Sequence, residues 1–187
     1  MKILKISVVM LMSIILFSGF WSGQSAQELR AQRVSESTHT LQLLYEYAPV
    51  ARSIVASAYG YATFSSVGVN VFFLSGAGGT GMAHNNKTGH NIYMNMASAG
   101  LGLGLGVKDF RAIFIFANKK AFDYFVTNGW EANAQADAAA KLNSRGGALN
   151  GAVSVMPGVR LYKLTQNGLA LQVTIQGTKY WPDSDLN

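Results

Sequence analysis

The sequence predicts an α+β fold: one or two N-terminal helices, then a mainly antiparallel, strongly curved and partly barrel-like sheet with one short internal helix. Three observations predict it. Apolar residues recur near one face of a helix over 27–47. From Tyr61 onward, short apolar and β-branched runs replace that pattern. Near the C-terminal end, Asn167-Gly168 separates two apolar runs, which is a strong hairpin signal.

The first 26 residues have the pattern of a secretory signal peptide. Lys2 and Lys5 precede the uncharged apolar run Ile6–Phe20, and small residues follow it. An uncleaved anchor is the alternative, although the run is short for a membrane span. The chain has no cysteine, which excludes disulfides, thiolate zinc sites and a lipidated cysteine. We therefore expect an exported protein, periplasmic or secreted.

The mature chain is expected to form an N-terminal helix over 27–47 and one domain over 48–187. Pro49 ends the helix, and 50–57 is expected to form a second short helix. Residues predicted near the apolar face of the first helix are Leu29, Val34, Leu41, Leu44 and Tyr45.

Strands are expected over 67–74, 90–97 and 112–116, the last buried on both faces because it is continuously apolar. The polar stretch 84–90 has the composition of a turn. After these strands, Asn118 is expected to cap a short helix that ends at Asn128-Gly129.

The stretch 130–138 alternates strictly, which favours a strand although alanine favours a helix. A loop over 141–151 follows. The runs 159–164 and 169–175 are expected to form the final hairpin.

Glycine alternates with leucine or valine at Gly100, Gly102, Gly104 and Gly106. In a strand this places all four glycines on one face. Glycine inside a strand marks close approach by another group. The sequence leaves open whether this group is protein, such as a helix or second sheet, or a ligand such as lipid.

The stretch Gly76–Gly81 matches G-x-G-x-x-G, but its surroundings do not fit a nucleotide site. No helix start follows, and no acidic residue lies about 20 residues further on. Met82-Ala83 stand where a P-loop needs Lys-Ser/Thr. We expect a flexible loop or bulged strand edge, and no nucleotide.

The sequence offers little support for a metal site, a catalytic site or a nucleic-acid-binding surface. His84 and His90 flank one turn without a third metal ligand nearby, and no nucleophile–base–acid pattern occurs. The 15 basic and 9 acidic residues are scattered, which does not resemble a nucleic-acid-binding surface. We expect no catalytic residue, no metal, no cofactor and no nucleic acid partner.

Several ordered segments resemble the SYLF family of lipid-binding domains. They include Tyr61-Ala-Thr-Phe-Ser-Ser-Val, the stretch Gly76–Gly81, the Gly100–Gly106 alternation, Gly129-Trp-Glu-Ala-Asn-Ala and the segment 167–179. The resemblance covers about 48–180 and implies a non-enzymatic domain. Eukaryotic members bind phosphoinositides and some bind actin, whereas bacterial members are exported proteins with a poorly defined role.

The expected function is therefore binding of anionic or phosphorylated lipid, at a phospholipid or membrane surface. The alternative is a protein-interaction module that docks on a cell-envelope partner through a sheet edge or an exposed apolar face. The candidate lipid-binding residues are the basic residues at turns and element ends, and the glycines of the bare strand face: Lys87, Arg111, Lys119, Lys120, Lys179, Gly100, Gly102, Gly104 and Gly106.

Overall fold

The structure, a computed structural model, describes residues 24–71, 74–101, 110–132, 151–166, 168–170 and 177–187. In chain order its elements are α2 (Ala26–Tyr47), α3 (Ala51–Ser57), β1 (Gly60–Val71), β2 (Leu74–Asn85), β3 (Asn91–Leu101), β4 (Phe110–Phe116), α4 (Lys119–Asn128), β5 (Trp130–Glu131), β6 (Val153–Met156), β7 (Val159–Thr165), β8 (Gly168–Leu169) and β9 (Thr178–Pro182).

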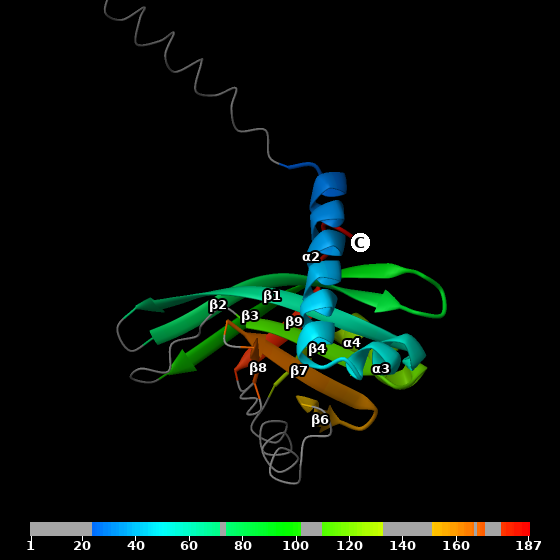
Figure 1. Cartoon of the computed structure of the whole chain (residues 1–187). Coiled ribbons are helices and arrows are strands. Elements are labelled where there is room, and N and C mark those ends of the chain that lie inside the picture. Colours follow the sequence, from blue (N-terminus) through cyan, green and yellow to red (C-terminus); the bar gives the residue numbers. More distant parts are fainter. Residues whose placement is uncertain (1–23, 72–73, 102–109, 133–150, 167, 171–176) are drawn as a thin grey trace, which may run out of the picture.

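The strands form one antiparallel sheet in the order β5-β9-β3-β2-β1-β4-β7-β6, with β8 paired to β7. In Figure 1 the long strands bend into a half-barrel, and α2 stands across them on one side. The helices α3 and α4 lie toward one end of the sheet. The predicted α+β class, with helices before a curved antiparallel sheet, is confirmed.

The N-terminal helix was predicted closely because its ends carry local signals. Ser25 Oγ accepts from the Glu28 amide at 3.2 Å, and Glu28 Oε2 accepts from the Ser25 amide at 2.8 Å. This capping box satisfies two of the free amides at the helix start. The helix ends at Tyr47, before Pro49.

Several further predictions are confirmed. The second short helix is α3, and the strand at 90–97 is contained almost entirely in β3. The Asn118 side chain caps α4 by accepting from the Ala121 amide at 3.0 Å, and Gly129 follows the helix with φ of 70°. The apolar strand at 112–116 lies in β4, and the final hairpin begins with β7 and β8.

Two predictions about the strands are wrong. The run 67–74 is not one strand, because the chain reverses between Val71 at the end of β1 and Leu74 at the start of β2. The stretch Gly76–Gly81 is neither a loop nor a strand edge. It lies inside β2 and pairs with β1 on one side and β3 on the other.

Other expectations fall outside the described residues. They concern the signal segment up to residue 23, Gly102, Gly104 and Gly106, the continuation of the 130–138 strand beyond Ala132, most of the 141–151 loop and the hairpin segment 171–175.

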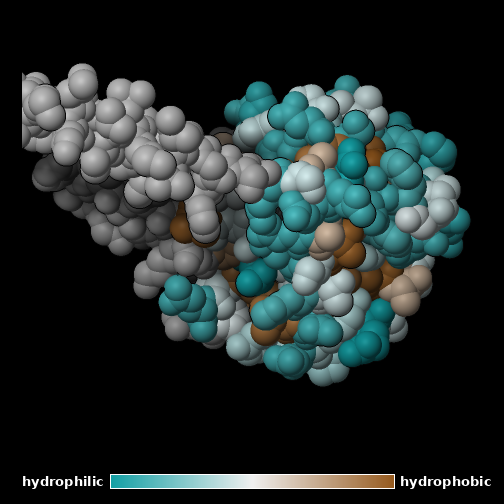
Figure 2. Space-filling view, turned by 90° about the horizontal axis from the view of Figure 1, so that it is seen from above, coloured by the Kyte–Doolittle hydropathy of each residue, from teal (hydrophilic) through white to brown (hydrophobic). Residues whose placement is uncertain are grey.

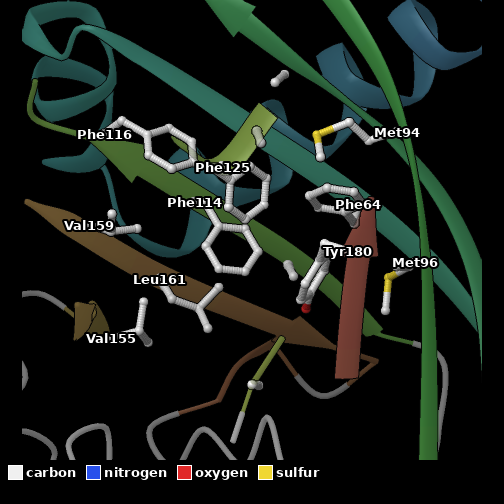
Figure 3. Packing of buried hydrophobic residues seen from close by; sticks show 14 of the residues in the cluster. Phe64, Met94, Met96, Phe114, Phe116, Phe125, Val155, Val159, Leu161 and Tyr180 are labelled. Carbon is white, nitrogen blue, oxygen red and sulfur yellow. The ribbon is translucent and has the colours of Figure 1, made fainter. Parts of the chain in front are cut away.

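The inner, concave face of the sheet holds an aromatic core. Figure 3 shows Phe64 from β1, Phe114 from β4, Phe125 from α4 and Tyr180 from β9 converging. The ring centre of Tyr180 lies 4.7 Å from that of Phe64 and 5.0 Å from that of Phe114. Three strands separate β9 from β4 in the sheet, so these contacts show how far it curls.

Two glycines of β2 permit this curl. A Cβ added to Gly79 would lie 2.4 Å from the Ser65 carbonyl oxygen, and one added to Gly81 would lie 2.1 Å from the Thr63 carbonyl oxygen. Any larger residue there would push β1 away. In β2, Gly79 and Gly81 therefore mark the close approach of the neighbouring strand β1.

The outer face is covered in part by α2. The C-terminal half of this helix packs Leu41 and Leu44 in a cluster with Ile113 and Tyr162 of the sheet. Earlier in the helix, the buried residues are instead the polar Arg33, Ser37 and Thr40, while Val34, predicted near the apolar face, is exposed. Seen from above, the surface is mainly hydrophilic, and its hydrophobic areas are small and separate (Figure 2).

Candidate functional site

A cleft of about 430 Å³ lies on the outer face, where the C-terminal half of α2 meets the sheet. This volume is within the usual range for small-ligand sites. The cleft is formed by α2, β1, β4, β7 and the turn after β7. Its lining residues are Leu43, Tyr47, Ser65, Ser66, Val67, Phe110, Arg111, Leu164, Thr165 and Gln166.

Arg111 is the cation of this cleft. Along β4, Phe110 and Ala112 face the inner core, so alternation places Arg111 on the outer face. Its Nη1 donates to Thr40 Oγ1 of α2 at 2.9 Å. No Asp or Glu is among the described lining residues, and Arg111 forms no ion pair within the described part of the chain. The remaining guanidinium donors are therefore available to an acceptor from outside.

Two serines of β1 differ sharply in their roles. Ser66 is buried, and its hydroxyl donates to the Phe110 carbonyl oxygen at 3.0 Å. Ser65 lies directly opposite Arg111 in the β1–β4 register and is half-buried. Within the described residues its hydroxyl has no hydrogen-bond partner. Ser65 and Arg111 thus place two kinds of donor side by side in the cleft.

The cleft also has apolar residues that reach solvent. Val67 is 68% exposed and Tyr47 is 54% exposed, which is high for side chains of this size. Both line the same cleft as Arg111. An amphipathic molecule would therefore find a cationic group and apolar surface together.

A polar clamp fixes the N-terminal half of α2 to β3 and to the segment after β9. Arg33 donates to the Met94 carbonyl oxygen at 2.8 Å and to Asp183 Oδ2 at 2.7 Å, and both charged side chains are about nine-tenths buried. Burial alone would raise the pKa of Asp183, but its bonds from the Asp185 amide and from Arg33 lower that pKa overall. The clamp holds the helix that carries Thr40.

The other basic candidates lie elsewhere. Lys87 is exposed in the turn after β2, and Lys119 and Lys120 are exposed at the start of α4, where Lys119 forms an ion pair with Asp123. These three lie at the end of the sheet where β1 begins, because Gly60 pairs with both Asn85 and Phe116. Arg111 lies at the opposite end of β4.

Lys179 is exposed on β9, where it pairs with Glu131 in the strand register. Gly100 lies in β3, paired with Ser75 of β2. The structure therefore does not gather the predicted basic residues into one patch.

The contacts of His84 are those of a structural side chain. His84 Nδ1 lies 2.6 Å from Asn91 Oδ1, and its ring centre lies 5.2 Å from that of Tyr61. Across the described residues, no three His, Asp or Glu side chains lie close enough together to hold a metal ion. Among the helices of this same part of the chain, none has the length and apolar character needed to cross a bilayer.

Sequence reasoning missed the partners of Arg111. Thr40 lies 71 positions away along the chain, and Tyr47 belongs to a different element, so only the tertiary fold brings them to the cleft. The sequence holds one weak indication of the position of Ser65, because strand alternation places it on the face opposite Phe64.

No family model matches the chain. The chain is similar to Beta cell expansion factor A of Aeromonas veronii, with 35% identity over 165 residues. This alignment covers 87% of the chain and 60% of that protein, so the chain spans less than two thirds of its relative's length.

Proposed function

We propose that this chain is an exported, non-enzymatic domain that binds anionic or phosphorylated lipid at the Arg111 cleft. The observation that carries the proposal is the half-buried guanidinium without a carboxylate partner in the described structure, next to exposed Tyr47 and Val67. A lipid at a membrane surface offers the matching chemistry, an anionic head group attached to an apolar body. The SYLF resemblance of the segments between 48 and 180 supports the same class of ligand.

The proposal is tested by vesicle flotation with the mature chain. Phosphatidylcholine vesicles containing an anionic phospholipid should carry the protein, whereas pure phosphatidylcholine vesicles should not. The Arg111→Gln variant should bind about tenfold more weakly, because a hydrogen bond to a charged group contributes about 1.5–3 kcal/mol.

Arg160→Gln is the matched control. Arg160 is an exposed arginine on the outer side of β7 that does not line the cleft. The Arg160→Gln substitution removes the same charge as Arg111→Gln and should leave vesicle binding near the wild-type level. Equal binding by the two variants would contradict a role for the cleft, and capture of a cell-envelope protein without any vesicle binding would favour a protein-interaction module.

A further inference from the structure

Resting on the proposed function, we propose that the Arg111 cleft selects lipids whose head group is a single terminal phosphate, as in phosphatidic acid, over phosphodiester and multiply phosphorylated head groups. The proposal follows from the number of charges, the number of donors and the apolar surface that the cleft combines.

The charge of the cleft suits one phosphate. Arg111 is its one cation among the described lining residues. Lys87, Lys119 and Lys120 lie at the other end of β4, and Lys179 lies on β9, which three strands separate from β4. A head group with several phosphates would leave most of its charge without a partner here, and an unpaired charge is costly where water is partly excluded.

The donors of the cleft suit a phosphomonoester. A guanidinium offers five N–H groups in a planar fork, and Thr40 accepts from one Nη of Arg111. The fork can therefore still donate to two phosphate oxygens, while the Ser65 hydroxyl beside it can donate to a third. A terminal phosphate has three such oxygens. A phosphodiester, as in phosphatidylglycerol, has only two.

Thr40 is a positioning residue in this arrangement. It is 1% exposed on α2, and its hydroxyl oxygen fixes the orientation of the Arg111 fork. The apolar lining residues Tyr47 and Val67 then favour a lipid over a soluble phosphate ester, because their exposed surface gains from contact with the glycerol and acyl part.

The test compares vesicles of phosphatidylcholine mixed with phosphatidic acid, phosphatidylglycerol or phosphatidylinositol 4,5-bisphosphate, at equal total head-group charge. The wild-type chain should bind the phosphatidic acid vesicles about tenfold more tightly than the other two. Arg111→Lys keeps the charge but loses the fork, so it should retain salt-sensitive binding while the preference falls to near unity.

Two further variants separate recognition from folding. Ser65→Ala and Thr40→Val should each reduce the preference for phosphatidic acid several-fold, with unchanged circular dichroism. Ser35→Ala on the exposed side of α2 is the control for loss of a hydroxyl and should keep the preference.

The outcomes are distinguishable. No binding to any anionic vesicle overturns both proposals. Equal binding at matched charge, or tighter binding to the bisphosphate lipid, overturns the head-group selection and leaves the proposed function standing. Release from vesicles by micromolar glycerol 3-phosphate would show that a soluble phosphate ester is the ligand, which also overturns the selection of a lipid.

Discussion

The inner and outer faces of the sheet are built from different kinds of side chain. The inner face is an apolar, largely aromatic cluster in which Phe64, Phe114 and Tyr180 are at most 1% exposed. The outer face combines an apolar seam under Leu41 and Leu44 with polar bonds at Arg33, Ser37 and Thr40. The inner face is therefore stabilised by apolar packing alone, whereas the outer face holds α2 partly through polar bonds and leaves some polar groups available for a ligand.

This comparison is tested most strongly by two glycines of the same strand. Gly81→Val should prevent folding or cost more than about 4 kcal/mol, because the new Cβ meets the Thr63 carbonyl oxygen on the inner face. Gly78→Val should leave the free energy of unfolding nearly unchanged, since a Cβ at Gly78 meets nothing within 4 Å. Urea denaturation of both variants checks this pair. Similar losses at the two positions would contradict the distinction between the faces.

Breaking the polar clamp of the outer face is expected to cause the next largest loss of stability. Asp183→Ala should cost about 3 kcal/mol, because it leaves the buried Arg33 guanidinium without its counter-charge. The nearby control is Asp185→Ala, which removes an exposed carboxylate and should change the stability little.

The same variant should change how stability depends on pH. The pKa of Asp183 is lower in the folded state than its unfolded value of about 3.9. Its contribution is therefore complete above that value and is lost as the pH falls through the lower folded pKa. Thermal melts between about pH 5 and pH 2 should show a shallower acid decline for Asp183→Ala than for the wild type. If the melting temperatures of the wild type and of Asp183→Ala fell equally steeply with decreasing pH, this role for the clamp would be contradicted.

On the inner face, removing one buried hydroxyl is expected to raise the stability slightly. The Tyr180 hydroxyl is buried without a hydrogen-bond partner in the described structure, and this burial raises the pKa of its phenol. Tyr180→Phe should keep the ring contacts and raise stability by about 1 kcal/mol, because an unsatisfied polar group is removed. A clear loss of stability by calorimetry would show that this hydroxyl has a role that the apolar core does not explain.

The sequence predicted elements with local signals and missed those that depend on distant strands. The limits of α2 and α4 follow from Pro49, Asn118 and Gly129, whose effects act within a turn or two. The reversal between β1 and β2 was missed, because the run 67–74 contains no turn residue at the reversal. The prediction of a flexible loop or bulged strand edge at Gly76–Gly81 is wrong, because this stretch of β2 is held by pairing with a strand on each side.

The candidate site was predictable only in part. Arg111 was selected as a basic residue near the end of a strand, and the structure places it in a cleft. Its surroundings were not predictable, since Thr40 reaches it only after α2 crosses the sheet and Ser65 only through the β1–β4 register. On the inner face, Phe64, Phe114, Phe116 and Phe125 pack against one another.

The most direct test of the outer face as the binding face uses two tyrosines with almost equal exposure. Tyr47 beside the cleft is 54% exposed and Tyr124 on α4 is 53% exposed, and the chain contains no cysteine. Tyr47→Cys and Tyr124→Cys variants can therefore each carry one environment-sensitive fluorophore. Adding phosphatidic acid vesicles should raise and blue-shift the emission at position 47 and leave position 124 unchanged. An equal change at both positions, or a change at position 124 alone, would contradict the assignment of lipid binding to the Arg111 cleft.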